Sequence, residues 1–225
     1  MHSIQRLCLS LFCLLHAFGS IAQTSAPILN GISIHTEFGQ EQFIGALFSK
    51  TPSDNAEELL RNANPSQMEL KIISPDGMTV RRFSRMWIEG MAINNSPELL
   101  IAQADSMVKF DSLFKNRLAQ GDDIVFKYVN SKGVDIIVNK ETLGNIQSDD
   151  FFKLLLSVWI GKVPLSTDFK NGILKNGRSD NILIARFDSI LPSEERIIET
   201  ASWPKSTFSL GSTSSKSANQ QIRIH

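Results

Sequence analysis

The chain has 225 residues, 42% of them hydrophobic, which is enough for one domain with a sizeable core. Its 23 basic and 23 acidic residues balance, and no basic tract is dense enough to follow a phosphate backbone. Nucleic acid is therefore not an expected partner.

The first 22 residues have the three parts of a secretory signal. A basic start is followed by an apolar run over residues 7–18 and by the small-residue exit Ser20-Ile21-Ala22. We expect cleavage after Ala22 and a periplasmic or secreted mature protein. The apolar run is shorter than the ~20 residues that cross a bilayer, so a membrane anchor is disfavoured and no transmembrane span is expected after cleavage.

Cleavage at this position removes both cysteines, Cys8 and Cys13. A lipoprotein site at Cys13 is disfavoured because large apolar residues follow it. The histidines that remain are His35 and His225, far apart in the sequence. We therefore expect no disulfide, no metal site and no cofactor in the mature chain.

The segment after the signal predicts a β-hairpin and then mixed elements, from alternating apolar residues, turn residues and helix caps. In chain order these are strands 28–36 and 41–48 around a bend at 38–40, a short helix 56–62, a strand 68–73, a turn at 75–77 and an amphipathic helix from Thr79 to residue 94. The last helix places its apolar residues at three- and four-residue spacing, so it should bury one wide face.

The second half of the chain predicts two helical regions with a strand meander between them. The expected elements are a helix 96–114, strands 124–129, 134–138 and 143–146, an apolar helix 151–160 ended by Gly161, and a last short helix 165–174. Residues 177–225 form a C-terminal extension, whose Ser-rich part from residue 206 we expect to be disordered.

Strands grouped in meanders, with helices grouped between them, favour an α+β fold. We expect an antiparallel sheet with a layer of helices on one face. The expected organisation is a signal peptide at 1–22, one domain at 23–176 and the extension at 177–225.

Three sequence blocks, at 82–94, 121–139 and 150–164, occur in an order that resembles the bacterial chalcone isomerase-like family. The resemblance covers residues 28–174, and its most specific part is the block from Phe152 to Pro164. It implies an open-faced sandwich with an apolar cleft between the sheet and the helices.

The resemblance also implies where a catalytic site would lie. Plant chalcone isomerases use an arginine, a tyrosine, an asparagine and a hydroxyl residue, which align here with residues 35–37, Phe83, Gly90 and Phe152. None of these positions keeps the donor. Because one oxyanion donor is worth about 3–4 kcal/mol, the plant reaction is not expected, and no catalytic residue is assigned.

The same replacements make the implied cleft more apolar, which suits a small apolar or amphipathic ligand such as a fatty acid. The expected site is lined by aromatic and small residues, with arginines that could meet a carboxylate. Its residues are Phe83, Trp87, Gly90, Phe152, Arg82 and Arg85. In the competing interpretation the aromatic residues are plain core and the arginines, with Arg81, are a solvated helix face.

Three functions stay open at this point. The first is an exported, non-catalytic protein that binds a small amphipathic molecule. The second is an isomerase-type enzyme with an unknown substrate. The third is an envelope module that contacts a protein partner through its C-terminal extension, although the sequence identifies no such partner.

Overall fold

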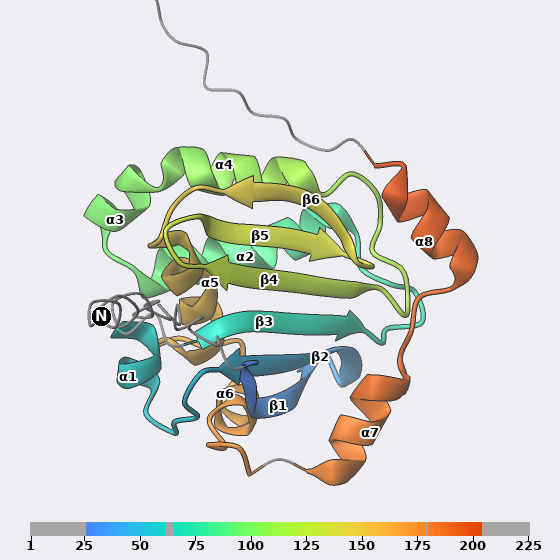
Figure 1. The fold of residues 1–225 in the computed structure, drawn as a ribbon, viewed down its shortest axis with the longest axis horizontal. Coiled ribbons are helices and arrows are strands. Elements are labelled where there is room, and N and C mark those ends of the chain that lie inside the picture. The colour runs from blue at the N-terminus through green and yellow to red at the C-terminus, as the bar shows by residue number, and fades with distance from the viewer. Residues whose placement is uncertain (1–25, 62–64, 179, 204–225) are drawn as a thin grey trace, which may run out of the picture.

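The computed structural model describes residues 26–61, 65–178 and 180–203 of the chain. The expected signal peptide at 1–22 and the Ser-rich tail from residue 206 lie outside the described residues. The described chain is an α+β fold in which one antiparallel sheet carries most of its helices on one face (Figure 1). None of the helices in these ranges is long and apolar enough to cross a membrane.

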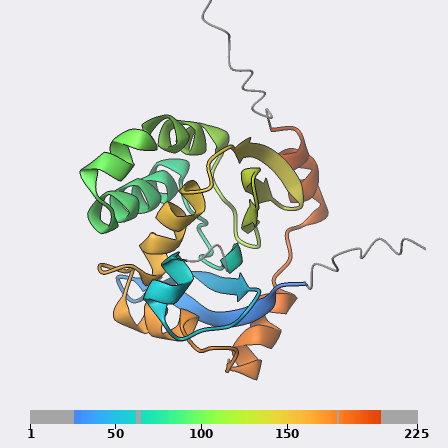
Figure 2. The same ribbon diagram turned by 60° about the vertical axis from the view of Figure 1, so that its left-hand side comes forward.

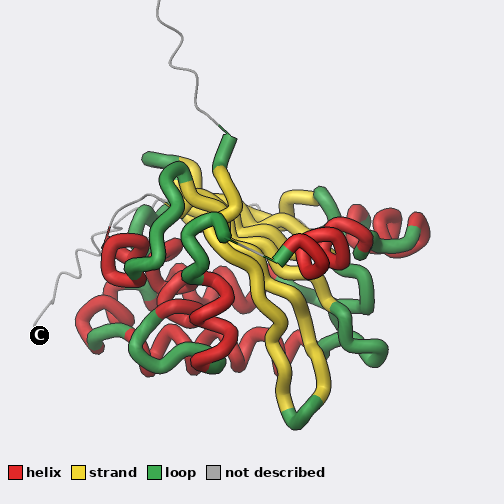
Figure 3. The backbone as a smooth tube through the Cα atoms, turned by 90° about the horizontal axis from the view of Figure 1, so that it is seen from below, coloured by secondary structure: helices red, strands yellow, loops and turns green. Residues whose placement is uncertain are grey.

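The sheet has six strands whose spatial order follows the chain, and every neighbouring pair is antiparallel. The strands are β1 (Ile28–Glu37), β2 (Gln40–Ser49), β3 (Pro65–Ile72), β4 (Asp123–Val129), β5 (Gly133–Val138) and β6 (Glu141–Ile146). The predicted hairpin closes through Phe38 and Gly39, both with positive φ, as a two-residue hairpin turn requires. This hairpin projects beyond the other strands (Figure 3).

Eight helices follow from the caps and apolar stripes of the described sequence. They are α1 (Ala56–Arg61), α2 (Val80–Asn94), α3 (Pro97–Ala102), α4 (Ala104–Leu113), α5 (Phe151–Ile160), α6 (Thr167–Ile173), α7 (Asn181–Ser189) and α8 (Glu194–Ala201). The prediction of a single helix over 96–114 is wrong, because Gln103 leaves helical geometry between α3 and α4. Its side chain accepts a hydrogen bond of 2.7 Å from Ser148 Oγ.

The main core lies between the sheet and helices α2, α4, α5 and α6 (Figures 2 and 3). Alternate strand residues face it, as the period of two predicts. On β3, for example, Met68, Leu70 and Ile72 are fully buried there. A second, smaller core forms on the opposite side of β1 and β2, where Ile44 packs near Phe187 of α7.

The C-terminal extension is folded over its described part. Sequence analysis expected the helix at 165–174 to be the last, which is wrong, because α7 and α8 follow it. A buried ion pair joins Arg196 of α8 to Asp122, with 2.7 Å between Nη2 and Oδ2, and Asn139 donates to the same carboxylate. Lys71 Nζ donates to the carbonyl of Phe187 at the end of α7. These bonds attach residues 180–203 to the sheet.

Candidate functional site

A groove of about 880 Å³ lies between the end of β1, one side of α2 and the segment that follows α5. Its walls combine three arginines, two glutamates, a histidine and a set of apolar side chains. They are His35, Thr36, Glu37, Met78, Thr79, Arg81, Arg82, Arg85, Met86, Glu89, Gly90, Ile93, Val158, Val163, Pro164 and Leu165. We call it the β1–α2 groove.

Helix α2 supplies half of this groove because its sequence divides into faces. Thr79 caps the helix, its side chain accepting from the amide of Arg82. Phe83 and Trp87 point into the core, four residues apart. The groove side of the same helix carries Arg82, Met86, Gly90 and Ile93, which follow one another at three- and four-residue spacing.

The charged groups of the groove form a partly paired rim. Arg82 makes an ion pair with Glu37, each side chain being about two-fifths exposed, at 40% and 41%. Arg85 Nε lies 3.9 Å from Glu89 Oε1 one helical turn away. Arg81 has no ion pair with any described residue. Exposed pairs are worth only 0–1 kcal/mol, so an incoming anion can displace either carboxylate at small cost.

His35 lies on the β1 side of the groove and is 8% exposed. Its ring packs on Phe43 and Phe169, with centroids 4.9 and 6.1 Å away. Burial lowers the pKa of His35, Glu37 opposes the shift and Arg82 adds to it. Within the described chain the buried Nδ1 has no hydrogen-bond partner. The imidazole is therefore neutral at neutral pH and keeps one nitrogen unused.

Gly90 allows α2 and α5 to approach closely. A Cβ atom at this position would lie 2.6 Å from Val158 Cγ1, well inside van der Waals contact. A side chain here would push the two helices apart. The glycine that replaces the family's asparagine is thus required by the packing of the groove wall, as well as lacking a donor.

Asn94 fixes the far wall of the groove, and sequence analysis missed it. Its Nδ2 donates to the carbonyls of Gly90 and Val163, at 2.9 and 2.8 Å, and its Oδ1 accepts from the Val163 amide at 2.8 Å. These bonds hold the segment after α5 against the end of α2. The available sequence signal was a polar residue at the end of α2 together with a glycine at the end of α5. This signal does not identify the groups that Asn94 bonds.

The structure divides the predicted site residues into two groups. Arg82, Arg85 and Gly90 line the β1–α2 groove. Phe83, Trp87 and Phe152 are buried in the main core and do not line this groove.

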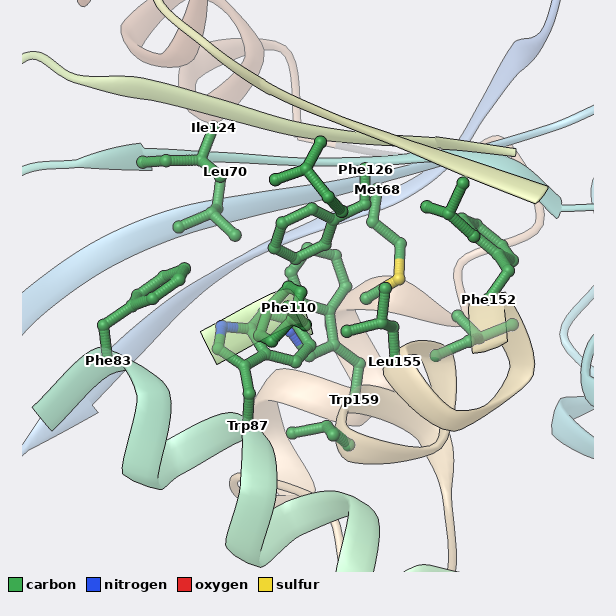
Figure 4. Packing of buried hydrophobic residues seen from close by; sticks show 14 of the residues in the cluster. Met68, Leu70, Phe83, Trp87, Phe110, Ile124, Phe126, Phe152, Leu155 and Trp159 are labelled. Carbon is green, nitrogen blue, oxygen red and sulfur yellow. The ribbon is translucent and has the colours of Figure 1, made fainter. Parts of the chain in front are cut away.

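Phe152 lies apart from Phe83, although the rings of Phe83 and Trp87 are in contact at 6.1 Å. Figure 4 shows Phe83 and Phe152 on opposite sides of the core, with Trp87 between them. Phe83 packs on Phe114 at a ring distance of 4.8 Å, whereas Phe152 packs on Tyr128 at 5.7 Å. The competing interpretation, that these aromatic residues are core, accounts for their positions.

The groove places cationic side chains beside an apolar wall, so it can hold an anion. Among the described residues no three His, Cys, Asp or Glu side chains are grouped so as to bind a metal ion. Two of the positions that the resemblance aligned with catalytic donors, residues 35–37 and Gly90, line this groove. The other two, Phe83 and Phe152, lie in the core instead.

Comparison with known proteins agrees with this architecture. A solved structure of a fatty-acid binding protein from Arabidopsis thaliana superposes with a TM-score of 0.52 at 12% identity, over 68% of this chain and 89% of that one. At this identity the likeness shows the fold. Curated protein sequences give no match. The family model described as chalcone isomerase-like matches residues 22–175, so the chain belongs to the chalcone isomerase-like family.

Proposed function

We propose that this protein binds a small amphipathic acid in the β1–α2 groove without transforming it. The observation that carries the proposal is the meeting of Arg82 and Arg85 with the apolar side chains of Met86 and Ile93 in one groove. Small-molecule sites are mostly apolar, with a few polar anchors that orient the ligand. That the structural neighbour is named a fatty-acid binding protein supports this choice of ligand class.

In the proposed complex the acid group lies at the rim, where it replaces Glu37 as the partner of Arg82. Guanidinium groups bind carboxylates through two parallel hydrogen bonds, which gives the headgroup a fixed orientation. The alkyl part lies along Met86, Ile93 and Val163 and is removed from water. Arg81, which has no ion pair within the described chain, adds a second positive charge at the rim.

The proposed lack of catalysis rests on two positions that the resemblance aligned with oxyanion donors. Phe83 has no hydroxyl and is fully buried, and Gly90 has no side chain. An enolate in the groove would therefore meet no donor from these two positions, and one such donor is worth about 3–4 kcal/mol.

The proposed place of action is outside the cytoplasm, because residues 1–22 have the pattern of a secretory signal. The family match that begins at residue 22 supports a domain that starts where the signal ends. Fractionation of the producing cells, with sequencing of the mature N-terminus, tests this. We expect a first residue of Gln23, and a cytoplasmic full-length chain would contradict the proposal.

Native mass spectrometry of the protein purified from the extracytoplasmic fraction tests ligand binding. We expect a bound species of the mass of an alkyl acid, or the uptake of one equivalent of dodecanoic acid at micromolar concentration. A protein that is purified empty and takes up no alkyl acid would overturn the proposed function.

An isomerase-type enzyme is the second candidate, because a neutral His35 shares the groove with Arg82 and could act as a base. Cyclisation of a chalcone, followed by absorbance against the spontaneous rate, distinguishes the two functions. We expect no acceleration, and an acceleration that a His35→Phe variant removes would establish the enzyme instead.

A further inference from the structure

A second groove, of about 1060 Å³, runs along the other side of α2, between that helix and α3 with α4. We call it the α2–α4 groove; these helices lie side by side (Figure 2). It is lined by Val80, Arg81, Ser84, Arg85, Ile88, Leu100, Ile101, Ala104, Met107, Val108, Asp111, Ser112, Phe114 and Lys115. Arg81 and Arg85 line both grooves, so they stand on the ridge between them.

The α2–α4 groove has a polar end and an apolar end. Ring contacts pair Phe83 with Phe114 and Trp87 with Phe110, at 4.8 and 6.2 Å, so α2 and α4 run antiparallel. The start of α2 therefore faces the end of α4. Polar lining residues gather at that end, beside the apolar Val80 and Phe114: Arg81, Ser84, Arg85, Asp111, Ser112 and Lys115. The opposite end is apolar: Ile88, Leu100, Ile101, Ala104, Met107 and Val108.

Ser84 lies beneath the polar end with its hydroxyl unpaired. The residue is 6% exposed, and its Oγ is buried without a hydrogen-bond partner within the described chain. A buried hydroxyl normally finds a partner, and a serine in a helix usually bonds the carbonyl one turn back. Ser84 therefore makes no polar contact that would close α2 against α4 at this end of the groove.

The charge and exposure of the walls indicate which molecule fits. Three cationic groups and the single carboxylate of Asp111 line the polar end, which leaves it positive. At the apolar end Ile101 and Val108 are 77% and 70% exposed, although both are large and aliphatic. Met107 beside them adapts to irregular apolar partners.

We propose that the α2–α4 groove binds one single-chain anionic amphiphile. Its head group faces Arg81 and Lys115, and its alkyl chain covers Ile88 and Ile101. Carboxylate and phosphate heads share this chemistry. Along α2 the groove runs from Val80 to Ile88, about 12 Å at the rise of a helix, which sets the length of the chain that fits. The site shares Arg81 and Arg85 with the β1–α2 groove and none of its other lining residues.

Variants that touch one groove only allow the two sites to be tested apart. Ala104→Trp fills the apolar end of the α2–α4 groove, and Ala102→Trp, on an exposed residue that does not line the groove, is its matched control. Lys115→Met removes the one cation of the polar end that does not also line the β1–α2 groove. Arg82→Met acts on the β1–α2 groove, since Arg82 does not line the other one.

The experiment is calorimetric titration of the full chain with dodecanoic acid and, in a second arm, with a lysophosphatidic acid, both below their micelle concentrations. For at least one of these heads we expect two binding events, of which Ala104→Trp and Arg82→Met each remove a different one. Lys115→Met should weaken the α2–α4 event three- to tenfold and leave the other event unchanged, because Lys115 lines only the α2–α4 groove.

Several results would overturn this second site. One is a single event that Arg82→Met alone removes. Another is an equal effect of Ala104→Trp and Ala102→Trp. A third is a ligand-free dimer in light scattering that Ala104→Trp dissociates, because a second copy would then occupy the groove. If wild-type protein shows only the event that Ala104→Trp removes, and no event that depends on Arg82, the result contradicts the proposed function and leaves this site in place.

Discussion

The two grooves on either side of α2 share Arg81 and Arg85 but are built in different ways. On the β1 side the walls are fixed: Gly90 meets Val158, and Asn94 holds the loop at Val163 by two hydrogen bonds. On the α4 side the helices meet through aromatic rings at the floor and leave a buried hydroxyl unpaired. A locked wall is preorganised for one ligand pose, whereas an open one tolerates several.

Gly90→Leu should have the largest effect, because its side chain would overlap Val158. We expect a loss of about 2–3 kcal/mol in the free energy of unfolding, measured by urea denaturation, together with loss of binding in the β1–α2 groove. Ala92→Leu, on the exposed face of the same helix, is the control and should stay near wild type. Equal stability of both variants would show that the α2–α5 contact is not tight.

Asn94→Ala should detach the loop from α2 and cost about 1–2 kcal/mol, since Asn94 satisfies backbone groups of Gly90 and Val163. Affinity for an alkyl acid should fall in the β1–α2 groove and stay unchanged in the α2–α4 groove. Asn145→Ala, which removes a bond to Asp135 elsewhere, should lower neither affinity. Equal weakening of both grooves by Asn94→Ala would mean that they are not separate sites.

His35 makes the stability of the β1–α2 groove depend on pH. Because burial lowers its pKa in the folded protein, the unfolded chain binds the proton more tightly. Stability is therefore fully present above pH ~6.5 and is lost as the pH falls from there through the folded-state pKa of His35. Thermal melts from pH 8 to 5 check this against His35→Phe, which should lose less stability on acidification. Parallel curves for the two proteins would contradict a buried neutral imidazole.

Glu37→Gln should have the smallest effect. It frees Arg82 from its exposed ion pair at a cost below about 1 kcal/mol in stability. Affinity for an alkyl acid should rise two- to threefold, because the ligand no longer competes with a carboxylate. A fall in affinity, seen in the same titration, would mean that Glu37 holds Arg82 in its binding position.

Much of the architecture was predictable from short-range patterns. The hairpin followed from alternation around Phe38 and Gly39, and the start of α2 followed from its Thr79 cap. Helices α7 and α8 were missed, although Asp180 and Ser193 cap them in the usual way, because their apolar stripes are short. The helix break at Gln103 was not predictable, because no glycine or proline marks it in the sequence.

The site was predictable only in part, for a physical reason. Periodicity identified the apolar face of α2, and Arg82, Arg85 and Gly90 do line a groove. Periodicity cannot tell a side chain that faces a cavity from one that faces a neighbouring ring, and Phe83 and Trp87 face rings. Which side of α2 stays open depends on β1 and on the segment after α5, both distant in sequence.

The central claim is that Arg82 anchors an acid in the β1–α2 groove. It is tested most directly by titrating dodecanoic acid into Arg82→Met and Arg186→Met. The two arginines are matched, because each makes one ion pair with a glutamate and the side chains of the pairs are 40–44% exposed, but Arg186 bonds Glu41 away from the groove.

The account predicts at least a tenfold loss of affinity in Arg82→Met and none in Arg186→Met. Equal affinities in the two variants would contradict it.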